Sequence, residues 1–200
     1  YKLDAVVLDK TGTITKGQPE VTDIVSFRKL NEAEILKLAA VTEKNSEHPL
    51  GTAIYEYGKK EFGAIPDPDA FEAIPGRGVR AVISGNSLLI GTRKLMAEQD
   101  IETGAILPVL EELEDDGKTA MIMAVNGQLE AIIAVADILK ENSIYAIDEL
   151  KRMGIAVYMI TGDNKRTANA IARQVGITNV LAEVLPENKA EEVEKLKKYG

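Results

Sequence analysis

An aspartate directly follows a short apolar run near the start of the sequence. Residues 3–8 read LDAVVL, and the next five, Asp9 to Thr13, read DKTGT. A mostly apolar run of this length is typical of a strand buried in a parallel sheet, and ligands gather beyond the carboxyl ends of such strands. A carboxylate there can attack a phosphorus atom and become an acyl phosphate, which divides one difficult transfer into two steps. Asp9 is therefore a candidate nucleophile.

A second group of residues fits the same chemistry, although it lies far along the chain. Thr161, Gly162 and Asp163 follow another apolar run, residues 155–160, and Lys189 stands near the start of the last expected helix. A lysine at that place would let an anionic carboxylate approach an anionic phosphate. Both groups are expected at the same edge of one sheet.

Hydroxyls and a divalent cation would complete such a site. The hydroxyls of Thr11 and Thr161 and the backbone N–H of Gly162 would hold the transferred oxygens, and Mg²⁺ would bridge Asp9 and the phosphate. A plain turn at Asp9 and a plain helix N-cap at residues 161–163 are the alternative interpretations. The DKTGT string argues against them, because a fixed five-residue string arises by chance in only about 6 of 100,000 chains of this length.

These motifs resemble the signatures of a known family. DKTGT resembles the phosphorylation motif of P-type ATPases, which belong to the haloacid dehalogenase-like superfamily, and TGDN with the downstream lysine resembles that superfamily's second and third motifs. The resemblance implies phosphorylation by ATP with Mg²⁺ as cofactor. It implies these catalytic residues: Asp9, Lys10, Thr11, Thr161, Gly162, Asp163 and Lys189, with Asp9 and Thr11 as magnesium ligands.

The residue two places after the nucleophile departs from the related phosphatases. In those enzymes an aspartate stands there and acts as general acid and base, whereas this sequence has Thr11. Without a base to activate water, a phosphorylated aspartate hydrolyses slowly unless another group supplies one. Thr11 is therefore expected to keep Asp9 phosphorylated long enough for a conformational change to be coupled to it.

The elements that carry these motifs alternate between strand and helix. In chain order they are a strand at 3–8, a helix from Ser143 to Gly154, a strand at 155–160, a helix after TGDN that Gly176 closes, a short strand at 179–184 and a charged helix opened by Pro186 and Glu187. This alternation is typical of an α/β domain.

The middle of the chain has a different pattern. Residues 79–83 and 88–90 flank Ser-Gly-Asn-Ser, and residues 119–125 and 128–136 flank Asn126-Gly127; both patterns predict β-hairpins, the second with a type I′ turn. Helical patterns occur at 35–41, 49–62 and 109–113, and the prolines of residues 65–69 indicate a loop. Met121 and Met123 alternate with Ile122 and Ala124, which indicates packing in a strand rather than a copper-binding methionine cluster.

The expected fold class is α/β. A discontinuous Rossmann-like, haloacid dehalogenase-like phosphorylation domain (1–18 and 137–200) would carry an inserted antiparallel α+β nucleotide-binding domain (19–136). P-type ATPases continue with a strand and a Gly-Asp-Gly-x-Asn-Asp loop, so the phosphorylation domain is expected to be truncated. In the superfamily that strand lies beside the Asp9 strand, so residues 3–8 should expose an apolar edge, with edge pairing or local disorder in residues 1–8.

Two motifs inside the insert also carry a resemblance. NSEHPL (45–50) and PGRGV (75–79) resemble the nucleotide-binding motifs of heavy-metal-transporting P-type ATPases. The resemblance implies that His48 orients the adenine, that Glu43 accepts a hydrogen bond from it, and that Gly76 and Gly78 admit the nucleotide closely. The family's Gly-Asn pair corresponds to Gly91-Thr92; the glycine carries over, and the threonine departs from the pattern.

Local sequence alone leaves ordinary alternatives for these residues. His48 also suits the start of a helix, because Ser-x-x-Pro is a good helix opening. A lone Gly-x-Gly is more often a plain turn, and an isolated Glu43 is most often a solvated charge. Their occurrence together, in the family's order, favours ATP as the ligand.

Composition narrows the partners and the metals. The net charge of -8 and the pI near 4.9 argue against nucleic acid and anionic lipid surfaces as main partners. With no cysteine and a single histidine, the sequence predicts no disulfide, no soft-metal site and no zinc site with histidine ligands. A bound metal would be a hard ion on carboxylates. No run is long and apolar enough for a membrane span, and the first residues do not resemble a signal peptide.

The resemblance points to the ATP-binding and phosphorylation region of a larger pump. The segments DKTGTITKGQPEVTD and EVLPENKAEEVEKL are most similar to those of the copper exporters of the family. Expected partners are ATP and the transmembrane and actuator domains of the same polypeptide, with this region on the cytoplasmic side of a plasma or inner membrane. Two alternatives stay open: a nucleotide-binding module without turnover in isolation, and a haloacid dehalogenase-type phosphatase whose insert is a cap.

Overall fold

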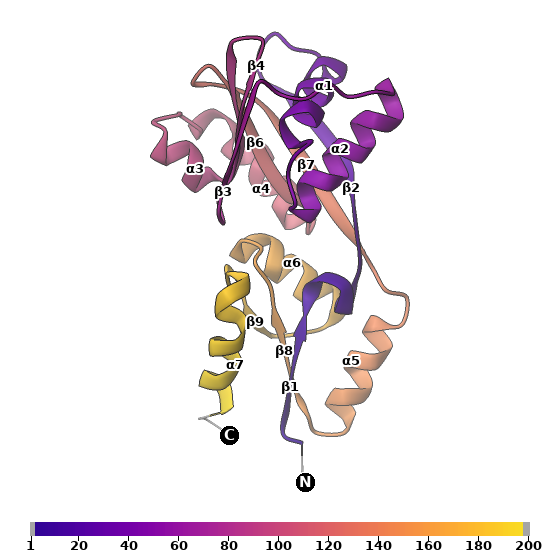
Figure 1. Cartoon of the computed structure of the whole chain (residues 1–200). Helices are drawn as coiled ribbons and strands as arrows, with labels where there is room; N and C mark the ends of the chain where they lie inside the picture. Colours follow the sequence, from indigo (N-terminus) through magenta and orange to yellow (C-terminus); the bar gives the residue numbers. More distant parts are fainter. Residues whose placement is uncertain (1–2, 198–200) are drawn as a thin grey trace. The chain divides into compact units, whose positions relative to one another are not determined.

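The computed structural model describes residues 3–197 and divides into two compact units. Unit 1 comprises residues 1–18, 114–119 and 137–200, and unit 2 comprises residues 19–113 and 120–136. Two hydrogen-bonded neighbours, β2 (Thr15–Ser26) and β7 (Gln128–Leu139), each run from one unit into the other (Figure 1). Each unit is described separately below.

Unit 1 is built on a parallel sheet. Within the described residues the strand order is β1-β8-β9, from β1 (Ala5–Asp9), β8 (Ala156–Ile160) and β9 (Asn179–Leu181). Asp9 pairs with Ile160 in register, so the residues that follow both strands emerge at the same sheet edge. The remaining elements are α5 (Ser143–Arg152), α6 (Lys165–Val175), the short helix η3 (Pro186–Asn188) and α7 (Lys189–Lys197).

Local sequence explains the ends of α6. The Asn164 side chain accepts the backbone N–H of Thr167 at 3.0 Å and begins the helix, and Gly176 ends it in the left-handed conformation at φ 75°. The face between these caps packs Ala168, Ile171 and Val175 into the core of unit 1. Helix and sheet therefore share one apolar cluster, as a doubly wound unit requires.

Unit 2 is built on an antiparallel sheet with the strand order β2-β7-β6-β5-β4-β3. The further strands are β3 (Ala70–Ile74), β4 (Gly78–Ile83), β5 (Asn86–Gly91) and β6 (Thr119–Val125). The predicted hairpin turns are present: Ser84 and Gly85 have φ 49° and 78°, and Asn126 and Gly127 have φ 50° and 75°. Two consecutive positive φ angles are the geometry of a type I′ turn.

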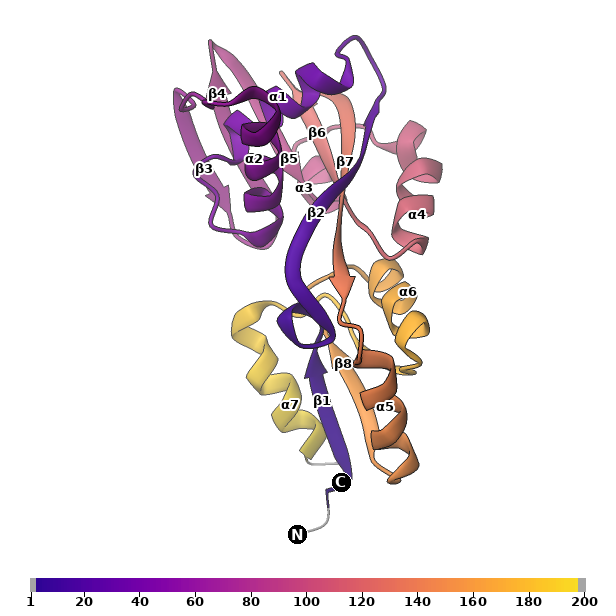
Figure 2. The same ribbon diagram turned by 90° about the vertical axis from the view of Figure 1, so that its right-hand side faces the viewer.

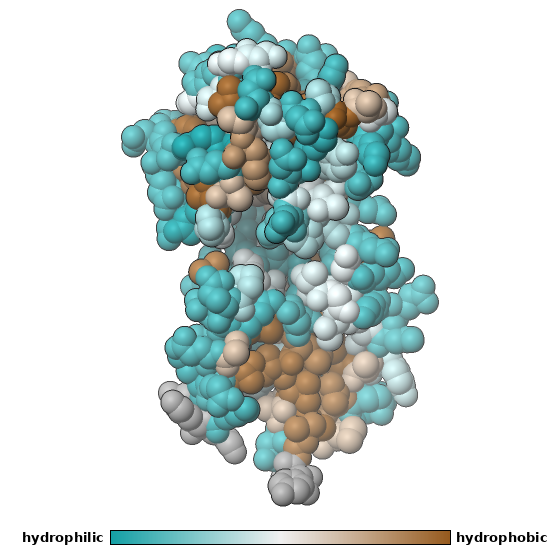
Figure 3. All heavy atoms as spheres, viewed as in Figure 1, coloured by the Kyte–Doolittle hydropathy of each residue, from teal (hydrophilic) through white to brown (hydrophobic). Residues whose placement is uncertain are grey.

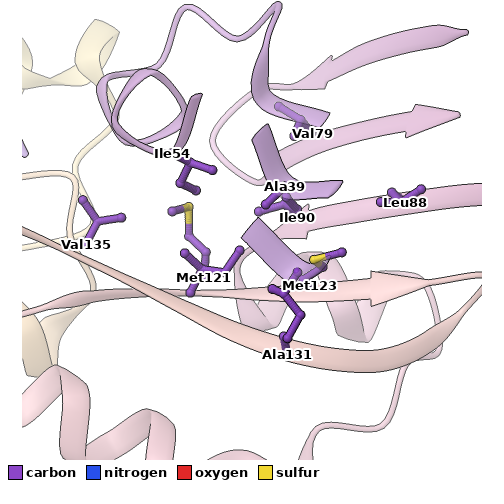
Figure 4. Close-up of a cluster of buried hydrophobic side chains, with 11 residues drawn as sticks. Ala39, Ile54, Val79, Leu88, Ile90, Met121, Met123, Ala131 and Val135 are labelled. Carbon is purple, nitrogen blue, oxygen red and sulfur yellow. The ribbon is translucent and has the colours of Figure 1, made fainter. Parts of the chain in front are cut away.

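Helices cover both faces of this sheet. On one side are α1 (Glu32–Glu43) and α2 (Pro49–Phe62); on the other are α3 (Arg93–Glu98), η2 (Gly104–Ile106) and α4 (Leu107–Asp115) (Figure 2). Alternate residues of β6 face opposite sides of the sheet. Met121 and Met123 pack with α1 and α2 (Figure 4), whereas Ile122 and Ala124 pack with α3 and α4. The two methionines are core residues, as the alternation predicts.

The predicted α/β class, with a parallel sheet and an antiparallel sheet in one chain, is confirmed. The strand expected at 179–184 is shorter, because Glu183 has φ 59° and the Val184 N–H turns to the carbonyl of Thr161 at 3.1 Å. The sequence patterns did not predict β2, β3 or α3. Among residues 3–197, no helix is both long enough and apolar enough to cross a membrane.

Candidate functional site

The loop after β1 presents Asp9 at the carboxyl edge of the parallel sheet. Its carboxylate accepts the Thr11 backbone N–H on Oδ1 at 3.2 Å, and the chain turns at once through Gly12, at φ 78°. Lys189, the first residue of α7, places its Nζ 2.6 Å from the other oxygen, Oδ2. The Asp9 side chain remains 38% exposed, so a solvent-borne ligand can reach it.

The other sequence-predicted residues of unit 1 form a second, more buried pair beside the first. Lys10 Nζ lies 2.7 Å from Asp163 Oδ2, and the two side chains are only 11% and 10% exposed. The Thr161 hydroxyl donates to the same Oδ2 at 2.9 Å, and the Thr119 hydroxyl donates to Oδ1 at 3.0 Å. Every hydrogen bond here stabilises the ionised carboxylate.

The electrostatics of Asp163 follow from these partners. Burial alone raises the pKa of this carboxyl. The Lys10 charge and the surrounding hydrogen bonds outweigh burial, so the pKa of Asp163 lies below its usual value. Asp163 is therefore an ionised group held in place, whereas the Asp9 side chain is more exposed to solvent.

Gly162 lies between Thr161 and Asp163 in the chain, and the segment after β9 packs against it. A Cβ at Gly162 would lie 3.4 Å from the carbonyl oxygen of Val184. The seven predicted catalytic residues are thus gathered into two neighbouring ion pairs and the backbone that joins them: Asp9, Lys10, Thr11, Thr161, Gly162, Asp163 and Lys189.

Asp137, which the sequence reading missed, braces the loop that carries Asp9. Its carboxylate accepts the Thr15 hydroxyl at 2.5 Å, the Gly17 N–H at 3.2 Å and the Gln18 N–H at 3.1 Å. Lys140 adds a hydrogen bond from Nζ to the Gly12 carbonyl at 2.5 Å. The available signal was an aspartate closing the apolar run AIIAVA, the same pattern that drew attention to Asp9.

The donor set around Asp9 suits a hard cation shared with a phosphate. Among residues 3–197, no group of three or more histidine, cysteine, aspartate or glutamate side chains is placed to hold a metal. Mg²⁺ is commonly held by one or two carboxylates, substrate phosphate oxygens and waters. Asp9, with Thr11 beside it, fits that mode and does not provide an all-protein cage.

In unit 2, Glu43 and His48 stand at the junction of α1 and α2. Glu43 is the last residue of α1 and only 4% exposed, so burial raises its pKa to about 7 against the lowering effect of a hydrogen bond from Ser46. His48 caps α2: its Nδ1 accepts the Leu50 N–H at 3.3 Å. The alternative of a solvated Glu43 is wrong, and the alternative of His48 as a helix-start residue is confirmed.

Of the three predicted glycines, Gly78 and Gly91 lie at the paired ends of β4 and β5, and Gly76 lies in the turn between β3 and β4. Gly76 turns the chain at φ 66°, and Gly78 pairs with Gly91 across the two strands. A Cβ on Gly78 would lie 2.1 Å from the Ile90 carbonyl oxygen, and one on Gly91 would lie 2.3 Å from the Arg77 carbonyl oxygen. The close approach of the two strands by itself requires glycine at Gly78 and Gly91.

The comparison with protein families matches this architecture. A family model described as haloacid dehalogenase-like hydrolase matches residues 3–200. The chain therefore belongs to the haloacid dehalogenase-like hydrolases.

Curated relatives narrow the similarity to one branch. The chain is 48% identical over 200 residues to a copper-exporting P-type ATPase of Bacillus subtilis (strain 168), and the match covers 100% of this chain and 25% of the relative. It is 49% identical over 201 residues to a copper-exporting P-type ATPase of Staphylococcus aureus (strain bovine RF122 / ET3-1), covering 100% of this chain and 24% of the relative. The chain spans about a quarter of the length of these curated relatives.

Solved structures of heavy-metal P-type ATPases also match this chain. A zinc-transporting PIB-type ATPase in its E2.Pi state matches with a TM-score of 0.66 and 35% identity, covering 100% of this chain and 32% of the other. The catalytic domain of the CPx-ATPase CopB-B matches with a TM-score of 0.74 and 25% identity, covering 100% and 68%. The resemblance to heavy-metal P-type ATPases that the motifs indicated is confirmed.

Proposed function

We propose that this chain is the ATP-binding and phosphorylation region of a copper-transporting P-type ATPase, in which ATP binds unit 2 and its γ-phosphate is transferred to Asp9. The observation that carries the proposal is the ion pair between Asp9 and Lys189, which are far apart in sequence and meet beyond the carboxyl end of β1. In this proposal unit 1 is the phosphorylation domain and unit 2 is the nucleotide-binding domain.

The transfer step follows from the groups around Asp9. An Asp9 carboxylate oxygen attacks the γ-phosphorus, the bond from that phosphorus to the β,γ-bridging oxygen breaks, and ADP leaves with the electron pair while an acyl phosphate forms. Lys189 offsets the repulsion between carboxylate and phosphate. Lys10 and Asp163 keep the neighbouring backbone fixed, so the Thr11, Thr161 and Gly162 groups stay in position for the phosphoryl oxygens.

Magnesium fits this site as a substrate-borne ion. Asp9 and Thr11 would hold it, and it would neutralise charge on the transferred phosphoryl group.

Thr11, two residues after the nucleophile, would lengthen the lifetime of the phosphorylated state. Thr11 has no basic group with which to activate water, so the acyl phosphate of Asp9 would hydrolyse slowly. A long-lived intermediate is what a transport cycle needs, because a conformational change must occur before the phosphate is lost. This residue favours a pump over the alternative of a phosphatase with a cap.

The nucleotide site is proposed on unit 2. Glu43 would accept a hydrogen bond from the adenine amino group, and His48 would orient the base. Gly76, Gly78 and Gly91 have no side chains, so the nucleotide could come close to the protein backbone there. The motif order and the similarity to copper exporters over the whole chain support this assignment. The remaining transmembrane and actuator domains of the same polypeptide would be its partners, on the cytoplasmic side of the membrane.

Nucleotide binding is tested on the chain itself. Titration with ATP, followed by NMR of the single imidazole, should shift the His48 resonances at millimolar nucleotide. An unmoved His48 resonance at that concentration would remove the nucleotide assignment.

Phosphorylation is tested on the intact membrane protein. Label from γ-labelled ATP should be acid-stable, labile to hydroxylamine and absent in Asp9→Asn. Label that survives this substitution would place the phosphate elsewhere. A chain that binds ATP while the intact protein forms no such label would support the alternative of a nucleotide-binding module without turnover.

A further inference from the structure

Ser46 lies in the turn between α1 and α2, between the two residues proposed to meet the base. Its hydroxyl hydrogen-bonds the Glu43 carboxyl. The same oxygen accepts the His48 backbone N–H at 3.3 Å, and the Ser46 N–H donates to the Glu43 carbonyl at 2.9 Å. One small side chain therefore connects the last residue of α1 with the N-cap of α2.

Gly51, in the first turn of α2, provides the space that this arrangement needs. A Cβ at Gly51 would lie 2.3 Å from Glu43 Oε2, 2.5 Å from Ser46 Oγ and 2.8 Å from Ser46 Cβ. Real Cβ atoms essentially never approach other heavy atoms within 3.0 Å. Any side chain at Gly51 would therefore displace the Glu43 carboxyl or the Ser46 hydroxyl.

The burial of Glu43 makes its orientation dependent on these two neighbours. A carboxyl that is 4% exposed has few waters to satisfy it, so its position follows its protein partners. A glutamate has three side-chain torsions; the Ser46 hydroxyl holds the end of this side chain by a hydrogen bond, in space that Gly51 leaves open.

We propose that Ser46 and Gly51 are positioning residues of the nucleotide site, which hold the Glu43 carboxyl at a fixed place relative to His48 for recognition of a purine base. Ser46 acts by its paired hydrogen bonds, and Gly51 acts by leaving room. This inference rests on the proposed binding of ATP to unit 2. Ser46 lies within the NSEHPL motif, but the resemblance gives no role to it or to Gly51.

Ser46→Ala tests the hydrogen-bonding part. Loss of a hydrogen bond to a carboxyl should weaken ATP binding by about fivefold to tenfold, and Ser46→Thr, which keeps the hydroxyl, should restore most of it. In the absence of nucleotide, ¹³C NMR should show a higher Glu43 pKa in Ser46→Ala, because the Ser46 hydrogen bond lowers that pKa. Ser87→Ala, an exposed serine in β5, is the matched control and should change neither value.

Glu43→Gln separates failure of this inference from failure of the proposed function. If Glu43→Gln weakens ATP binding while Ser46→Ala binds as the unmodified chain does, the positioning role of Ser46 is overturned and the nucleotide site stands. If the unmodified chain binds no ATP at millimolar concentration, the proposed function fails and this inference fails with it.

Gly51→Ala and Gly58→Ala form a matched pair, since both add one methyl group to α2. A Cβ at Gly58 would lie 2.3 Å from the Ala40 Cβ, where α2 packs on α1. Gly58→Ala should therefore lower the thermal midpoint and leave ATP affinity unchanged, whereas Gly51→Ala should weaken ATP binding about fivefold or more. Unchanged ATP affinity in Gly51→Ala would overturn the role given to that glycine.

Discussion

Two buried carboxyls of this chain have pKa values shifted in opposite directions, and their neighbours explain the difference. Glu43 has a hydroxyl as its partner, so burial dominates and raises its pKa to about 7. Asp163 has the Lys10 ammonium and two hydroxyls, which together overcome burial and lower its pKa. A charge of opposite sign within hydrogen-bonding distance therefore decides whether a buried acid is ionised at neutral pH.

The raised pKa of Glu43 predicts a pH dependence of unit 2 stability. Between pH 4.5, the usual value, and about 7, the folded state binds a proton that the unfolded chain has released. The free energy of unfolding should therefore fall as the pH rises through that window, by on the order of 3 kcal/mol in total. Urea unfolding from pH 4 to pH 8, followed by amide signals of α1 and α2, measures the effect.

Glu43→Gln is the control for this prediction. A neutral amide does not titrate, so the fall in stability over this window should largely disappear in the variant. A pH profile identical to that of the unmodified chain would mean that Glu43 is not the group responsible.

At the scale of elements, the end of β7 and the start of α5 hold the Asp9 loop. The Ile14 carbonyl accepts the Lys140 N–H at 3.0 Å and the Ser143 hydroxyl at 2.7 Å, beside the hydrogen bonds that Asp137 accepts. Thr15 is fully buried, and its hydroxyl lies 2.5 Å from the Asp137 carboxylate and 3.0 Å from the Lys10 carbonyl. The end of β7 and the start of α5 thus position the loop that follows β1.

Asp137→Ala should destabilise unit 1 by about 2 to 3 kcal/mol, because it leaves a buried hydroxyl and two backbone N–H groups without their charged acceptor. Hydrogen exchange should accelerate most at residues 12–18. Asp137→Asn keeps one acceptor oxygen and should have an intermediate effect. Asp148→Ala, at an exposed position of α5, is the control. Equal destabilisation by both alanine variants would contradict the role of Asp137 in holding the Asp9 loop.

The strand β1 lies at one end of the strand order of the parallel sheet, as the sequence led us to expect. Hydrophobic residues gather on the surface of unit 1 over β1 (Figure 3), and Leu3 is 58% exposed. The expected disorder of residues 1–8 concerns, in part, Tyr1 and Lys2, which lie outside the described residues. An unpaired apolar strand edge favours pairing with another chain.

We therefore predict concentration-dependent association of this chain in solution, which Val6→Lys should reduce by placing a charge on the strand. Sedimentation velocity over a range of concentrations measures it. A monomer at every concentration, with the β1 amides protected from exchange, would contradict the prediction.

At the scale of the whole molecule, the division into units predicts that unit 2 folds without unit 1. Its three apolar clusters and nearly all of its sheet are made by its own residues. Residues 19–136 expressed alone should give a dispersed amide spectrum that overlays that of the whole chain at α1 and α2. ATP affinity should agree within about twofold if the nucleotide site belongs to unit 2 alone.

Residues 114–119 are where the excised unit is expected to differ. They cluster with unit 1, where Thr119 donates to Asp163 and the Lys118 carbonyl accepts the Thr167 hydroxyl at 2.8 Å. Amide signals of this segment should move in the excised unit, and those of α1 should not. Large shifts throughout α1 and α2 would show that unit 2 depends on unit 1 for its structure.

The sequence by itself determined the features that depend on neighbouring residues. Periodicity located β1, β8, α2 and α6, the Asn126-Gly127 pair specified its turn, and DKTGT identified the reactive loop, because strand, turn and cap preferences act over a few residues. The tertiary structure alone decided the partners of those residues. Asp137 under the Asp9 loop, Lys10 against Asp163, and Ser46 with Gly51 around Glu43 depend on which segments pack together, and packing joins residues whose separation in sequence carries no local signal.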